Sequence, residues 1–233
     1  MSLSTVPFVL RIFIRSAGFA LIVLFLVCPA NSQNAGQVSS NNSASAPSAD
    51  PLVFTEEDRE KGLKYLEETS ELFFKEISEL TPAQLNFRES PDRWSIAEAA
   101  EHIIIAEKTI LSLIEKKVVT APPPAGKDNF RLQDQAIWMA ITNRNTKFSA
   151  PEPVQPKGEM RSKAAILKEF RETRGRTSSF LKNTGVDLRN RFGTLPVIGT
   201  IDGFQWFIFI NSHCYRHLEQ IKEIRSDPKF PAR

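Results

Sequence analysis

The chain of 233 residues contains three histidines, and two of them, His213 and His217, are four residues apart. On a helix this spacing places both side chains on one face, with Cβ atoms about 5–6 Å apart, so two imidazoles can share one metal ion. A third ligand must come from another part of the chain, and His102 is the remaining histidine. It lies in a second strongly helical segment, WSIAEAAEHIIIAEKTILSLIEKK. We therefore predict that His102, His213 and His217 form one metal site.

Three imidazoles and a water molecule match a catalytic zinc site, which keeps one coordination position open. Neutral imidazole also suits nickel, copper and iron, so the ligand types leave the metal open, with zinc or nickel expected first. The segment HCYRH has no glutamate after its first histidine, so the general base of an H-E-x-x-H metalloprotease is missing. No other residue stands out as a general base, and the catalytic residues stay unknown.

Residues next to the histidine pair have structural interpretations that compete with functional ones. Cys214 lies about 100° round the helix from His213 and is more typical of a small buried hydrophobic residue than of a ligand or nucleophile. Arg216 could clamp an anionic substrate, although an ion pair with a carboxylate such as Glu101 is the favoured interpretation.

Four further residues also have competing interpretations. Trp94 and Trp206 are expected in the core rather than as a platform for a ligand. For Glu107 and Tyr215 the sequence does not decide between a position facing a cavity and a position on the surface.

Apolar residues recur at helical spacing in five segments that could position these side chains. A capping box starts the segment of His102 at Ser95, and Asp202 caps the segment that carries the histidine pair. This last segment is apolar nearly all round, which is typical of a helix in the middle of a bundle. No stretch has a convincing strand pattern, so the predicted class is all-α. Helices are predicted from Thr55 to about Leu80, from Ser95 to about Lys117, over Asn129–Thr146, from Ser162 to about Asn183, and from Asp202 to Arg225.

The two caps also predict the depth of each histidine in the bundle. His102 is seven residues beyond its cap, about 10.5 Å along the helix axis. His213 and His217 are eleven and fifteen residues beyond theirs, about 16 and 22 Å along the axis. If the two helices are antiparallel, the three imidazoles can therefore meet in the interior of the bundle.

The first 32 residues have the layout of a secretory signal peptide. Arg11 and Arg15 precede an apolar run, Ala17–Val27, and small residues follow before a predicted cleavage site at Gln33. The run is shorter than the roughly 20 residues that a spanning helix needs. Residues 33–51 are rich in Ser, Asn, Ala and Gln and predict a flexible linker. The folded domain is therefore expected over residues 52–228, in a protein exported to the periplasm or the extracellular space.

Charge and cysteine content limit the classes of partner. Removal of residues 1–32 would leave 28 basic and 27 acidic side chains, whereas nucleic-acid binders usually carry a basic surplus. Cys28 would leave with the signal peptide, so Cys214 would have no partner for a disulfide. A lipid anchor at Cys28 is the minor alternative, since Phe25, Leu26 and Val27 lack the small residue that lipoprotein processing needs. We expect no nucleic acid partner, no stable membrane insertion after cleavage, and a core held by apolar packing.

Three segments together resemble the DinB superfamily, and within it the DinB_2 group: DRWSIAEAAEHIIIAE, NRNTKFSAPEPVQPKGEMRSKAAILKEF and GTIDGFQWFIFINSHCYRHLEQIKEI. The resemblance covers roughly Thr55–Ser226. It implies an up-and-down four-helix bundle with an extra helix, and a divalent metal ion held by three histidines with an open water position. His102, His213 and His217 fall on those ligand positions. Many members of the family act on cytosolic thiols of low molecular weight. The predicted export would separate this protein from those thiols, so the resemblance does not establish a thiol as its substrate.

Two classes of function follow from these observations. The first is an exported, DinB-like metal-dependent hydrolase or thiol S-transferase that acts on a small molecule. The alternative is a non-catalytic exported helical bundle whose metal site is structural or vestigial. The sequence does not identify the substrate, and it does not decide whether the protein forms a homodimer.

Overall fold

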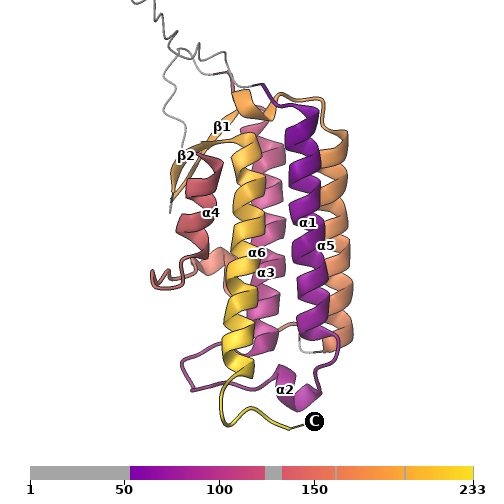
Figure 1. The fold of residues 1–233 in the computed structure, drawn as a ribbon, viewed down its shortest axis with the longest axis vertical. Coiled ribbons are helices and arrows are strands. Elements are labelled where there is room, and N and C mark those ends of the chain that lie inside the picture. The colour runs from indigo at the N-terminus through magenta and orange to yellow at the C-terminus, as the bar shows by residue number, and fades with distance from the viewer. Residues whose placement is uncertain (1–52, 124–132, 161, 197, 233) are drawn as a thin grey trace, which may run out of the picture. The chain divides into compact units, whose positions relative to one another are not determined.

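The structure, a computed structural model, describes residues 53–123, 133–160, 162–196 and 198–232. The predicted all-α bundle with an extra helix is confirmed. The signal peptide and linker predicted for residues 1–32 and 33–51 lie outside the described residues. Within the described part of the chain a short helix, α4 (Asp134–Thr142), packs beside a bundle of four long helices (Figure 1), which are α1 (Glu56–Ile77), α3 (Ile96–Leu113), α5 (Lys163–Asn183) and α6 (Gly203–Arg225).

The four long helices do not alternate strictly in direction along the chain, as the helices of a simple up-and-down bundle do. Helices α1 and α6 run in one direction, and α3 and α5 run in the other (Figure 1). Accordingly Arg59, near the start of α1, donates hydrogen bonds to the carbonyls of Lys182 and Thr184 at the end of α5. Arg225 and Glu76, each at the end of its helix, form an ion pair between α6 and α1. Helices α3 and α5 are thus parallel, and the long connection that contains α4 returns the chain to the end of the bundle where α5 begins.

The predicted N-caps are present at Thr55, Ser95, Ser162 and Asp202. Each side chain accepts a hydrogen bond from a backbone N–H in the first turn of its helix, which satisfies a donor that has no partner within the helix. At α6 the carboxylate of Asp202 accepts the N–H of Gln205 at 2.9 Å. The predicted starts of α3 and α6, which set the depths of the histidines, are therefore confirmed.

A short hairpin corrects the expectation that no residues form strands. Strand β1 (Phe192–Leu195) pairs antiparallel with β2 (Gly199–Asp202). Four residues are too few to show the alternating pattern that identifies a strand in a sequence. Gly199 has φ +96°, a conformation that L-residues with a side chain rarely adopt, so the turn into β2 depends on glycine.

The connections hold further short elements that the sequence did not predict. The third predicted helix, Asn129–Thr146, is shorter in the structure, where α4 ends at Thr142 and residues 129–132 lie outside the description. The helix of His102 continues beyond Leu113 as one turn of π-helix. The short elements are α2 (Pro82–Leu85), the π-helix η1 (Ile114–Val118), and the 3-10 helices η2 (Glu152–Val154) and η3 (Leu188–Asn190).

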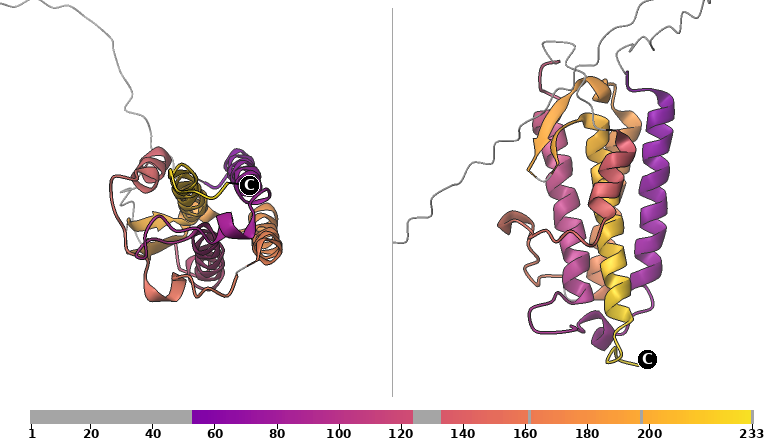
Figure 2. Two further views of the ribbon diagram at one scale, coloured as in Figure 1. Left: turned by 90° about the horizontal axis from the view of Figure 1, so that it is seen from below. Right: turned by 60° about the vertical axis from the view of Figure 1, so that its left-hand side comes forward.

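Helix α6 is buried nearly all round because it has neighbours on three sides. Viewed along the bundle, α1 and α3 flank it within the four-helix arrangement, and α4 covers its outer side (Figure 2). Every residue from Gly203 to Ser212 is buried. The predicted central position of this helix is confirmed. In the described part of the chain no helix is both long and apolar enough to span a bilayer.

A buried arginine fixes the end of the bundle where α6 begins. Arg189, which is 6% exposed, donates hydrogen bonds to Asp58 of α1, to Asp134 of α4 and to Asp202, the N-cap of α6. Its guanidinium also lies 4.4 Å from the ring centroid of Phe204. One cation therefore holds three helix starts together and sets the position from which α6 runs down to the histidines.

We expect Arg189→Met to lower the free energy of unfolding by about 3–5 kcal/mol, because it leaves three carboxylates without their shared cation. Urea denaturation followed by circular dichroism measures the change. Lys64→Met is the control, because Lys64 forms an exposed pair with Glu68, and it should cause no measurable loss. Equal stability of the two variants would contradict this account.

Candidate metal centre

The three predicted histidines meet in the interior of the bundle. One ring nitrogen from each of His102, His213 and His217 can be chosen so that all three lie within 4.8 Å of one another. The ring centroids are 4.5 to 5.0 Å apart. His102 Nε2 lies 3.1 Å from His213 Nε2. The convergence follows from the two capped starts and from the antiparallel packing of α3 against α6 (Figure 1).

Hydrogen bonds on the far sides of two rings select their tautomers. His102 Nδ1 lies 2.7 Å from the carbonyl oxygen of Val154, and His217 Nδ1 lies 2.8 Å from Gln220 Oε1. Both oxygens can only accept, so each Nδ1 must carry the proton and each Nε2 keeps its lone pair. Metal-ligating histidines are usually held in this way by a carbonyl or a carboxylate. Val154 and Gln220 are therefore parts of the site that the search for histidines missed.

A motif search could not have found Val154, because its contribution is a backbone carbonyl in a loop. Gln220 carried a weak signal, since it lies three residues beyond His217 and so on the same face of the helix.

Aromatic rings surround the three imidazoles. The ring centroid of Trp94 lies 4.8 Å from that of His102 and 6.2 Å from that of His217. The Phe209 ring packs 5.7 Å from His213. The expectation for Trp94 therefore needs correction, because it is half-buried and forms a wall of the histidine cluster, whereas Trp206 lies in the core as predicted.

Burial keeps the imidazoles neutral. It lowers the pKa of His102, and it lowers the pKa of His217 to about 3. The pKa of His213 falls well below its ordinary value for the same reason, with a further contribution from the neighbouring histidines. A neutral imidazole with a free lone pair is the form that binds metal. The donor set, its spacing and its protonation therefore fit a divalent transition-metal ion.

The predicted ion pair between Arg216 and Glu101 is wrong. The Arg216 guanidinium instead donates to the carbonyls of Ile141, Asn143 and Thr146, at and beyond the end of α4. It thereby satisfies carbonyls that the helix leaves without partners. Glu101 accepts hydrogen bonds from backbone N–H groups of another loop.

The remaining candidates take structural positions. Cys214 is 1% exposed, and burial raises the pKa of its thiol to about 11, so it is the inert buried residue that was expected. Glu107 is buried and forms an ion pair of 2.8 Å with Arg174 of α5. Tyr215 is half-buried against the ring of Trp138.

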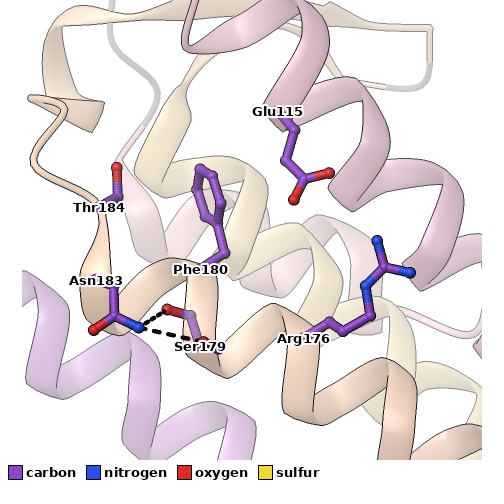
Figure 3. A pocket seen from close by; sticks show the side chains of 6 residues that line it. All are labelled: Glu115, Arg176, Ser179, Phe180, Asn183 and Thr184. Carbon is purple, nitrogen blue, oxygen red and sulfur yellow. Dashed lines mark hydrogen bonds between the residues drawn. The ribbon is translucent and has the colours of Figure 1, made fainter.

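A surface cavity of about 490 Å³ lies away from the histidines, between η1 and the last turns of α5 (Figure 3). Five of its six lining residues are polar, and Glu115 of η1 faces α5, where Phe180 and Arg176 lie on either side of it. None of the three histidines lines it.

Protonation of the buried histidines should destabilise the metal-free protein. Unfolded histidine titrates near pH 6.5, whereas the pKa of folded His217 is lowered to about 3, so the unfolded state binds more protons below pH 6.5. We therefore expect stability to be fully present above about pH 6.5 and to fall as the pH drops from there. NMR titration of the imidazole protons in metal-free protein, together with urea midpoints at about pH 7.5 and about pH 5, checks this. A His217 signal that titrates near pH 6.5 would contradict it.

Similarity of sequence and of structure relates the chain to known proteins. The protein is 26% identical over 150 residues to the uncharacterized protein YuaE of Bacillus subtilis (strain 168), an alignment covering 64% of this chain and 88% of YuaE. A solved structure, YfiT from Bacillus subtilis, is described as a probable metal-dependent hydrolase with an unusual four-helix bundle topology. It matches with a TM-score of 0.49 and 17% identity, over 77% of this chain and 91% of that chain. The family model of the DinB superfamily matches residues 65–221, and the chain therefore belongs to the DinB superfamily.

Proposed function

We propose that this protein binds one divalent metal ion through His102, His213 and His217 and acts with it as a metal-dependent enzyme on small molecules. The observation that carries the proposal is the hydrogen bonding of the Nδ1 atoms of His102 and His217. These bonds leave the Nε2 atoms of both rings without the proton, and His102 Nε2 lies 3.1 Å from His213 Nε2 in the cluster. A buried ring N–H needs an acceptor in any core, but here three histidines converge as well, and metal-ligating histidines are held by the same kind of hydrogen bond.

The protein's own residues would supply orientation and exclusion of water. Val154 and Gln220 hold two of the rings in one tautomer, and Trp94 covers the same two rings. When bound, a divalent ion in such a site supplies Lewis acidity and makes water or a thiol more acidic. We propose zinc or nickel, because three neutral imidazoles suit both.

The reaction class that this arrangement supports best is hydrolysis or thiol S-transfer. Three protein ligands are the number found in catalytic zinc sites, whereas structural zinc sites usually have four. The cluster of described residues comprises three side chains, which favours the enzyme over a non-catalytic bundle with a structural or vestigial site.

Export is part of the proposal and rests on the sequence of residues 1–32. A basic segment, an apolar run and small residues before Gln33 support cleavage there. An exported enzyme would meet substrates outside the cytoplasm. N-terminal sequencing of protein from the native host checks this, and an intact Met1 on protein in the cytosol would overturn it.

We expect His102→Ala, His213→Ala and His217→Ala each to abolish stoichiometric metal binding, because two remaining imidazoles hold an ion too weakly to survive desalting. Cys214→Ala is the matched control in the same helix and should bind one equivalent like the wild type. Elemental analysis of protein loaded with zinc or nickel and then desalted gives the stoichiometry. Wild-type protein that retains no metal would overturn the proposed function.

A screen of ester hydrolysis and of thiol transfer to electrophiles tests the enzyme directly. We expect one of these activities in metal-loaded protein, its loss on chelation, and its return when zinc or nickel is added back. His213→Ala should show none of it under any loading. Protein that holds metal but is inactive across the screen would favour the non-catalytic alternative.

A further inference from the structure

The carboxylate of Glu101 is buried and, among the described residues, accepts hydrogen bonds from backbone groups of one loop. The residue is 1% exposed. Its Oε1 accepts hydrogen bonds from the N–H groups of Lys157 at 3.1 Å and Glu159 at 3.2 Å, and its Oε2 accepts the N–H of Gly158 at 2.9 Å. A buried carboxylate is costly unless it is paired or fully hydrogen-bonded, so the loop and the carboxylate depend on each other.

The loop that binds Glu101 also contains Val154, whose carbonyl oxygen orients His102, the next residue of α3. Val154 closes the 3-10 helix η2, three residues before Lys157, and its carbonyl oxygen lies 2.7 Å from His102 Nδ1. Helix α3 therefore presents two successive residues to one loop, a carboxylate that accepts from it and an imidazole that donates to it. Gly158 has φ +69°, which lets consecutive N–H groups converge on the carboxylate.

We propose that Glu101 is a positioning residue for the metal site: by holding the loop at residues 157–159 it places the Val154 carbonyl against His102 Nδ1 and so keeps the His102 Nε2 lone pair facing the other two histidines. The inference rests on the proposed function, since His102 is one of its three ligands. It gives a role to a buried charge that makes no ion pair among the described residues.

The simpler interpretation is that Glu101 only anchors a surface loop. That role predicts a loss of stability and no specific change at His102. The tautomer of His102 separates the two, because it depends on whether the Val154 carbonyl stays in place.

Glu101→Gln removes the carboxylate with almost no change of size. Whichever way the new amide points, its NH2 group faces at least one backbone N–H that previously had an acceptor. We expect the loop to loosen and the nitrogen-15 NMR shifts of His102 in metal-free protein to move from the Nδ1–H tautomer towards an average of both tautomers. Zinc affinity, measured by competition with a chromophoric chelator, should fall about 10- to 100-fold.

Two controls match this change. Glu159→Gln makes the same substitution at an exposed side chain in the same loop and should alter neither the tautomer nor the affinity. Glu107→Gln disturbs another buried carboxylate of α3, the partner of Arg174, and should lower stability while leaving the His102 tautomer unchanged. If Glu101→Gln does not fold, Gly158→Ala strains the same loop from the other side and should shift the tautomer in the same direction.

The outcomes separate the two proposals. A wild-type tautomer and wild-type zinc affinity in Glu101→Gln would overturn the positioning role. A shifted tautomer in a protein whose wild type binds neither zinc nor nickel would support the positioning role and overturn the proposed function.

Discussion

Every residue of α6 from Gly203 to Ser212 is buried, and a helix that is buried on all sides needs neighbours on all sides. Within a four-helix bundle a helix still has one side facing outward. Here α4 covers that side of α6, and Arg216 of α6 binds the carbonyls at and beyond the end of α4. The long connection between α3 and α5 contains α4 and so supplies this cover. The same connection makes α3 and α5 parallel and contains the loop that reaches His102.

The interior of the bundle also contains polar groups, and two of its buried arginines have partners on several helices. At one end Arg189 joins three aspartates, which fixes where α6 starts. Deeper in the bundle, Arg174 of α5 contacts Glu107 of α3 and Thr69 of α1. Because an unpaired buried charge costs several kcal/mol, these contacts allow the helices few alternative registers. The register in turn brings His102 opposite His213 and His217, so the proposed metal site depends on ion pairs that do not touch it.

The site combines a rigid frame with one irregular loop. The helices supply the three imidazoles, but the loop supplies the carbonyl that decides which nitrogen of His102 is free. Preorganisation of this kind reduces the entropy lost when an ion binds, because the lone pairs need not be reoriented. The aromatic wall of Trp94 adds burial, and burial keeps the rings neutral. The positions of the three imidazoles, the tautomer of His102 and the neutrality of the rings therefore depend on different parts of the fold.

The sequence by itself determined the helices, their caps and the three histidines, because these are local properties. A cap such as Asp202 acts within one turn, and the pairing of His213 with His217 needs only helical spacing. The hairpin escaped detection because its strands are four residues long. Only the tertiary structure decided the partners of Arg216 and Glu101, which bind backbone groups that no side-chain pattern specifies. It likewise decided the tautomer of His102, because the Val154 carbonyl arrives from 52 residues away along the chain.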